Sequence, residues 1–293
     1  MAQFYKSTNK LPLAALIGIP VSFAVLTSIF AVIYALGIWY CPIVYINALI
    51  CFGWAFVSAI LAGIVIKATK ARFPFAVGLL ALVGALVGYY VHWCVWLSLV
   101  ANPFVSRDIG DIGSALAPDF ILNFILHPTY AWDFAVEVNK QGVWTLGKAK
   151  TLVNGPFLTI IWGVEFLIYA ISVWLFSFTK AMDPFSEETN AWYKKAKYKN
   201  NEFVAPDDPQ EHAKVVNKIA EGDLSYFLDA PILLATCDHT FKLEIYSLPT
   251  SSVAYVTVSM GVLNKKGAWD YSALVTYMSV SRDITDEIVP RTQ

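Results

Sequence analysis

The chain has 293 residues, of which 57% are hydrophobic and 15% are charged, and its formal net charge is −1. Soluble domains carry about 25% charged residues, so this composition excludes an ordinary soluble protein over the whole length. The missing charges are concentrated in a few long segments, which indicates a membrane protein.

Three segments are almost free of ionisable side chains. Residues 11–66 contain no Asp, Glu, Lys, Arg or His. Among residues 73–106 the only one of these is His92, and among residues 151–179 it is Glu165. A membrane-spanning helix needs about 20 mostly apolar residues, so the first segment holds two spans and the others hold one each. The predicted spans are residues 11–40, 41–66, 73–101 and 153–179.

The positive charges predict how these spans are oriented. Lys and Arg accumulate next to the cytoplasmic ends of membrane helices, so both termini are expected in the cytoplasm, at a bacterial-type inner membrane. Residues 102–150 then form an outer loop, and residues 180–293 are cytoplasmic. The first span is too long for a signal peptide core and is expected to be retained. The charges that carry this orientation are Lys6, Lys10, Lys67, Lys70 and Arg72.

The outer loop contains two predicted helices. Residues 118–127 place apolar side chains at helical spacing, which predicts a short helix at the outer interface. A second helix is expected over residues 129–139, capped by Thr129 and ended by Gly142. Alternating apolar residues over 132–138 leave a β-hairpin that turns through residues 140–142 as the alternative. One face of the second helix is expected to carry Trp132, Ala135, Val136 and Asn139.

The third span carries a pattern of close helix packing. Gly84, Gly88 and His92 follow one another at intervals of four residues. Small residues at this spacing let a second helix approach closely, so His92 is expected to face that helix rather than lipid. Close packing of two helices is by itself a sufficient explanation of this pattern, and a functional site is the alternative explanation.

Glu165 is the single carboxylate inside an apolar span. A carboxylate at the centre of a bilayer costs about 2.5–3.5 kcal/mol on insertion scales, so it is normally paired or turned toward a wet cavity. Asn47 and Tyr89 lie at a depth similar to those of His92 and Glu165. We expect these four residues to form one polar cluster, with the carboxylate within about 6 Å of the imidazole. A proton or ion site is the functional interpretation, and an interhelical hydrogen bond is the structural one.

The last part of the chain has the pattern of a small α+β domain. Residues 206–209 open a helix with an acidic cap, and Gly222 closes it. After Gly222 the chain is expected to continue helically over residues 224–234. Alternation over residues 241–245 predicts a strand. A hairpin follows, with strands at residues 253–263 and 269–280 joined by residues 264–267. The prediction is a three-stranded antiparallel sheet.

Charge and motifs exclude several functions for this domain. Residues 180–293 carry 12 Lys and Arg against 16 Asp and Glu, which argues against nucleic acid because binding to phosphates needs a basic face. No phosphate loop, nucleophile elbow or H-E-x-x-H motif is present, so no catalytic residue is predicted. The four cysteines form no CxxC pair, His127, His212 and His239 are expected at solvated surfaces, and the tryptophans are expected in interface belts.

Two turns in the domain share a motif. Residues 184–192 read P-F-S-E-E-T-N-A-W, and residues 247–252 read S-L-P-T-S-S. Both resemble the knuckles of a zinc ribbon, with Ser186, Thr189, Leu248 and Ser251 at the ligand positions. Zinc ribbons bind the metal through four thiolates, and none remains here, so the resemblance implies a zinc-ribbon-like domain that has lost its metal. Two ordinary turns are the alternative, and no zinc or other cofactor is expected in either case.

Together these features predict an α-helical membrane protein. Residues 1–179 form a four-transmembrane-helix bundle with a structured outer loop, and residues 180–293 form the cytoplasmic α+β domain. The expected role is a membrane-anchored interaction or scaffold subunit whose tail docks a partner protein or a second copy of the chain. The alternative is a proton- or ion-coupled transport or channel component that uses Glu165 and His92. The lipid bilayer is the other expected partner.

Overall fold

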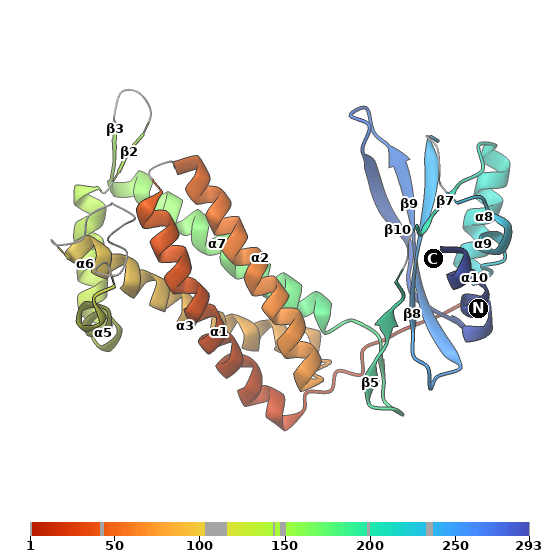
Figure 1. Ribbon diagram of the computed structural model, residues 1–293, viewed down its shortest axis with the longest axis horizontal. Helices are drawn as coiled ribbons and strands as arrows, with labels where there is room; N and C mark the ends of the chain where they lie inside the picture. The colour runs from red at the N-terminus through yellow and green to blue at the C-terminus, as the bar shows by residue number, and fades with distance from the viewer. Residues whose placement is uncertain are drawn as a thin grey trace. The chain divides into compact units, whose positions relative to one another are not determined.

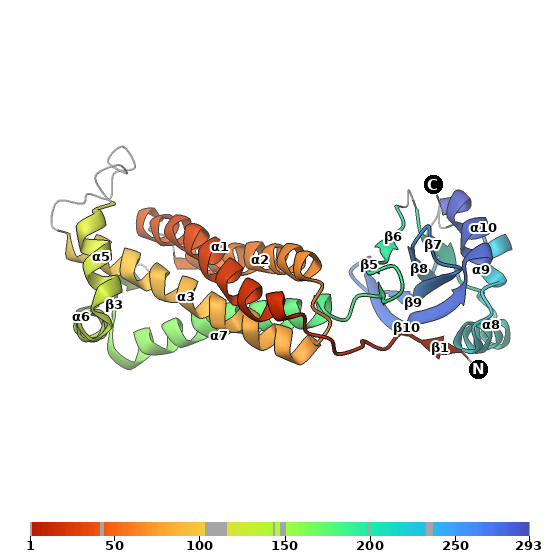
Figure 2. The same cartoon turned by 90° about the horizontal axis from the view of Figure 1, so that it is seen from below.

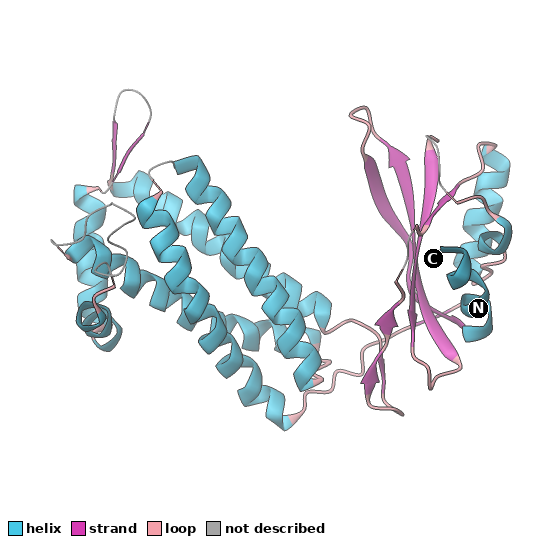
Figure 3. Ribbon diagram, viewed as in Figure 1, coloured by secondary structure: helices cyan, strands magenta, loops and turns pink. Residues whose placement is uncertain are grey.

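The chain folds into two compact units. The computed structural model describes residues 2–41, 44–102, 116–142, 144–146, 151–197, 200–232 and 237–292. One unit comprises Thr8–Met182, and the other combines Met1–Ser7 with Asp183–Gln293. Figure 1 follows the chain through both, and Figure 3 shows that the first is mainly helical while the second contains the large sheet. The first seven residues were expected with the helical bundle, and they belong instead to the other unit.

The first unit is built on four helices that are long and apolar enough to cross a membrane, as predicted. These helices are α1 (Leu13–Tyr40), α2 (Val44–Thr69), α3 (Pro74–Ala101) and α7 (Gly155–Lys180). The link between α2 and α3 is tied to the segment before α1, because the amide of Arg72 donates to the carbonyl of Lys10 at 2.8 Å. Two groups of predicted cytoplasmic charges therefore lie at the same end of the bundle.

Helix α3 packs closely on α1 at the predicted glycines. A Cβ atom added at Gly84 would lie 2.6 Å from Cβ of Phe23 and closer still to the carbonyl oxygen of Pro20. A Cβ atom added at Gly88 would lie 2.7 Å from Cβ of Thr27. Real Cβ atoms do not approach other atoms so closely, so the two glycines allow the contact between the helices.

Two further helices pack at one end of the bundle, α5 (Pro118–Leu126) and α6 (Pro128–Gln141). The hydroxyl of Tyr90 on α3 donates to the carbonyl of Phe124 on α5 at 2.8 Å. The amide of Asn139 on α6 donates to the hydroxyl of Thr159 on α7 at 3.2 Å. These two bonds hold α5 and α6 against the bundle. A short hairpin of β2 (Trp144–Leu146) and β3 (Thr151–Val153) connects α6 to α7.

Both helices, α5 and α6, were predicted, with one error in detail. Helix α6 begins after His127 with Pro128 in its first turn, so Thr129 lies inside the helix and is not its cap. Gly142, with φ of +74°, ends the helix as expected. The alternative hairpin through residues 140–142 is wrong, because α6 continues to Gln141. Helix α6 turns Ala131 and Val138 inward, whereas Trp132 is 72% exposed.

The second unit contains a six-stranded antiparallel sheet. Its strand order is β1–β10–β9–β8–β6, and β7 also pairs with β8. The three predicted strands are the central ones, and β1, β6 and β7 add to the edges. The predicted number of three was therefore wrong, because strands of two or three residues leave no alternation for the sequence to display. The strands are β1 (Gln3–Phe4), β6 (Lys194–Lys195), β7 (Glu202–Val204), β8 (His239–Ser247), β9 (Val253–Leu263) and β10 (Trp269–Ser281).

One face of the sheet is covered by α8 (Pro209–Glu221), α9 (Tyr226–Asp229) and α10 (Arg282–Thr292) (Figure 2). Helix α8 begins as predicted, because the carboxylate of Asp208 accepts from the amide of Gln210 at 2.8 Å. It ends at Gly222, whose φ is +99°. Over the predicted extension at residues 224–234, the only α-helix among the described residues is α9, and residues 233–234 lie outside the described chain. Alternation along β8 buries Phe241, Leu243 and Ile245 in the core.

The N-terminal strand is part of this sheet. Gln3 and Phe4 pair with Ser279 and Met278 of β10, and the amide of Tyr5 donates to the carbonyl of Tyr277 at 2.9 Å. Hydrogen-bonded strands must lie in one compartment, so the N-terminus and the second unit are on the same side of any membrane that the helices cross. An even number of spans meets this requirement.

Candidate functional site: a polar cavity in the helical bundle

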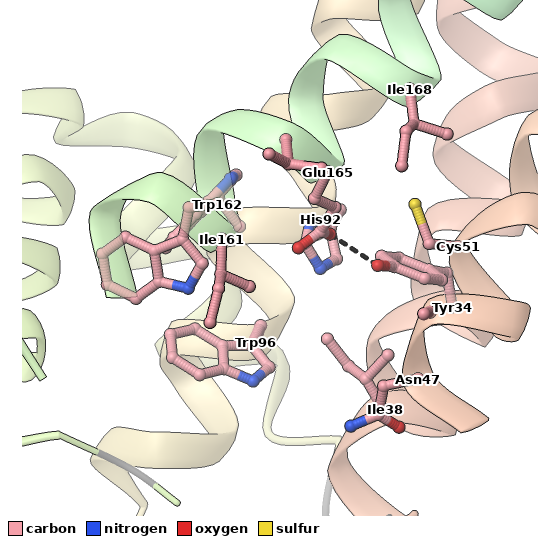
Figure 4. Close-up of a pocket in the computed structure, with 13 residues that line it drawn as sticks. Tyr34, Ile38, Asn47, Cys51, His92, Trp96, Ile161, Trp162, Glu165 and Ile168 are labelled. Atoms are coloured by element: carbon pink, nitrogen blue, oxygen red, sulfur yellow. Dashed lines mark hydrogen bonds between the residues drawn. The ribbon is translucent and has the colours of Figure 1, made fainter. Parts of the chain in front are cut away.

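Glu165 lies on α7, and its hydrogen-bond partner comes from α1. The hydroxyl of Tyr34 donates to Oε1 of Glu165 at 2.5 Å (Figure 4). Tyr34 was not predicted as a member of the polar cluster. Its one signal was a phenol well inside the apolar run of the first span, at a depth where an interface residue is not expected.

His92 lies on α3, and its ring packs against the ring of the same tyrosine. Its ring centroid is 4.7 Å from that of Tyr34 and 5.8 Å from that of Tyr89. The side chain faces α1, as the glycine pattern predicted, and it is only 3% exposed. Neither ring nitrogen has a hydrogen-bond partner among the described residues.

A cavity of about 220 Å³ joins most of the predicted polar cluster. Glu165, His92 and Asn47 all line it, and Tyr34 and Cys51 complete its polar wall. Figure 4 shows that these side chains come from all four long helices. Tyr89, the fourth predicted member, contacts the ring of His92 but does not line the cavity. The hydrogen bond of Glu165 goes to Tyr34 and not to His92. The expected approach of the carboxylate to within about 6 Å of the imidazole stays a prediction.

Three tryptophans, Trp93, Trp96 and Trp162, form much of the remaining wall. The rings of Trp93 and Trp162 meet edge to face at 4.8 Å, and Trp96 packs against Trp162 at 6.1 Å. Trp54 on α2, which does not line the cavity, stacks on Tyr34 at 4.6 Å. Trp93 and Trp96 meet Trp162 because helices α3 and α7 turn these rings toward each other. The sequence spacing alone did not distinguish that orientation from one facing lipid.

The two histidines of the second unit lie next to each other, although each was expected at a solvated surface. The rings of His212 on α8 and His239 on β8 are 5.5 Å apart, and both are partly buried. Nε2 of His212 lies 3.4 Å from the sulfur of Met260 on β9. The two histidines are distant in sequence, so only the packing of α8 on the sheet could bring them together.

The two knuckle-like turns have ordinary hydrogen bonding. The first is a hairpin of β4 (Phe185–Ser186) and β5 (Ala191–Trp192), in which the amide of Thr189 donates to the hydroxyl of Ser186 at 3.2 Å. Ser251 in the second turn shares a hydrogen bond of 2.9 Å with Tyr193. None of the four cysteines forms a disulfide bond. Over the described ranges of the chain, no group of three or more His, Cys, Asp and Glu residues is placed to hold a metal ion.

Comparison with known proteins leaves the site to be interpreted from its own geometry. No family model matches the chain, and neither a curated protein nor a solved structure matches it.

Proposed function

We propose that this protein is a membrane-anchored interaction subunit of a bacterial-type inner membrane. The four long helices cross the bilayer, both termini lie in the cytoplasm, and the second unit docks a partner protein. The apolar helices support the anchoring role. The pairing of β1 with β10 supports placing both ends of the chain in one compartment.

The observation that carries the docking role is an open strand edge. Strand β10 pairs with β9 along most of its length, whereas β1 pairs only with Met278 and Ser279. Within the described chain, no strand pairs with the outer edge of β10 at residues 269–275. An exposed edge presents unpaired backbone donors and acceptors, and partner proteins use such edges by adding an extended segment.

The side chains along this edge suit an extended segment of a partner protein. Ser272 and Ala273 are exposed and small, so they leave room for an added strand. The register shifts between Ala273 and Val275 and again before Met278, so the regular part of the edge ends where β1 begins. The open stretch is about the length of an average strand.

Photocrosslinking in native membranes tests this role. A photoreactive phenylalanine analogue at Ala273 should give a discrete adduct with one other protein. The same residue at Val262, which is 39% exposed on β9, is the matched control and should give none. The identified partner, added to the purified full chain, should then slow hydrogen exchange of the amides at residues 269–275. No adduct, equal adducts at both positions, or an adduct of two copies of this chain would contradict the proposal.

A second candidate function rests on the polar cavity. Glu165 and His92 line the same space inside an apolar bundle, and ionisable residues within membrane spans commonly mark proton or ion pathways. In this candidate the protein is a proton- or ion-coupled transport or channel component. Loss of proton-coupled activity in Glu165→Gln at normal abundance would favour it over a packing role.

A further inference from the structure

Three buried polar atoms of the cavity lack a protein partner. They are Nδ1 and Nε2 of His92 and Oδ1 of Asn47, as far as the described residues extend. Inside a bilayer no bulk water reaches such atoms, so leaving them unpaired is unfavourable. Both side chains line the cavity, so a molecule within it can satisfy them.

The size of the cavity limits what that molecule is. A volume of about 220 Å³ is several times the ~30 Å³ that one water occupies in the liquid. It is smaller than the roughly 300–1,000 Å³ of pockets that enclose a drug-sized ligand. The space therefore fits a single ring or a head group of similar size, with the rest of the molecule outside.

The walls and the mouth indicate that the rest of the molecule is apolar. Trp93, Trp96 and Trp162 supply flat apolar surfaces inside the cavity. Val164 on α7 is 50% exposed, and Ala48 on α2 is exposed as well. Both also line the cavity, so it borders the outer surface of the bundle between α2 and α7. In a membrane that surface faces lipid, which makes the bilayer the source of the ligand.

The polar groups define the head group. A neutral imidazole offers one donor and one acceptor, and Oδ1 of Asn47 adds an acceptor. Oε1 of Glu165 already accepts from Tyr34, and none of the described residues that line the cavity is Lys or Arg. An anionic head group would find no positive partner. The complementary head is uncharged and both donates and accepts hydrogen bonds.

We propose that the cavity binds a lipid-soluble small molecule whose uncharged, hydroxyl-bearing ring hydrogen-bonds to His92 and Asn47. This site is independent of the docking role of the second unit. It also differs from a proton pathway, because it requires a bound organic molecule and not a mobile ion.

Binding of 4-hexylresorcinol to the full chain in lipid nanodiscs tests the proposal. The ligand carries two hydroxyls on one ring with an apolar tail, and tryptophan fluorescence can follow it because three tryptophans line the cavity. We expect saturable binding that is about tenfold or more stronger than that of hexylbenzene, which has the same ring and tail without hydroxyls. His92→Phe and Asn47→Leu should each weaken binding by about tenfold.

The control variant is Ser58→Ala, which removes a buried hydroxyl on α2 outside the cavity. It should leave 4-hexylresorcinol binding unchanged, and helical circular dichroism should confirm that all three variants are folded. Absence of saturable binding would mean that water fills the cavity and would overturn the proposal. Equal binding of hexylbenzene, preferential binding of hexyltrimethylammonium, or no effect of either cavity variant in folded protein would overturn it too.

Discussion

Replacing Gly84 with alanine will destabilise the bundle by about 3 kcal/mol, at the upper end of the usual cost of overpacking. The new methyl group would meet the backbone carbonyl of Pro20 and Cβ of Phe23. A backbone atom cannot rotate away, so α1 and α3 must separate along their contact. Gly88→Ala should cost nearly as much because its methyl group would meet Cβ of Thr27 at 2.7 Å. The measurement is the midpoint of thermal unfolding of the full chain in detergent.

Gly163→Ala is the matched control for both variants. Gly163 lies in α7, and a Cβ atom added there meets nothing within 4 Å. Alanine has a higher helix propensity than glycine by about 1 kcal/mol. The Gly163→Ala variant should therefore unfold at the same temperature as the parent protein or slightly above that temperature. If all three alanines behave alike, the glycines of α3 do not set the distance between α1 and α3.

Replacing Tyr34 with phenylalanine will destabilise the protein by about 1–3 kcal/mol, the cost of leaving a buried polar group without its partner. Tyr34 provides the hydrogen bond of 2.5 Å to Glu165. Glu165→Gln should cost less, because a neutral amide oxygen still accepts that bond and needs less solvation than a carboxylate. Adding Glu165→Gln to Tyr34→Phe should therefore recover part of the lost stability. Chemical unfolding of the four proteins in detergent measures this coupling.

Tyr130→Phe is the control for the loss of a hydroxyl. Tyr130 is 49% exposed on α6, so its change should stay within about 0.5 kcal/mol of the parent. Equal effects of Tyr34→Phe and Tyr130→Phe would show that the bond to Glu165 contributes nothing to packing. Glu165 would then need another reason to lie within the bundle.

The helices and the centre of the sheet could be predicted because their signals are local. Long uncharged runs specify α1, α2, α3 and α7 without knowledge of any contact. The same holds for the start and end of α8, where Asp208 and Gly222 act within one turn of the helix. Alternation along β8 identified its buried face from neighbouring residues alone.

Other features could not be predicted, because they depend on contacts between distant residues. Tyr34 and Glu165 are separated by 131 positions, and many pairings of polar groups at similar depth satisfy the sequence equally well. The strand at Gln3 and Phe4 has no pattern of its own and exists only because β10 offers an edge. Helix α10 was missed for a different, local reason, since its short amphipathic pattern follows β10 directly without a Gly or Pro boundary.

The orientation of the chain in the membrane is the foundation of the proposed role, and reporters of compartment test it most directly. A reporter fused after Gln293 and a short epitope tag before Met1 should both be found in the cytoplasm. A reporter inserted near Ser114, which lies outside the described residues, should be found on the outer side. Termini in opposite compartments would contradict the pairing of β1 with β10 in the membrane-bound protein. An external C-terminus would contradict the proposed cytoplasmic docking unit.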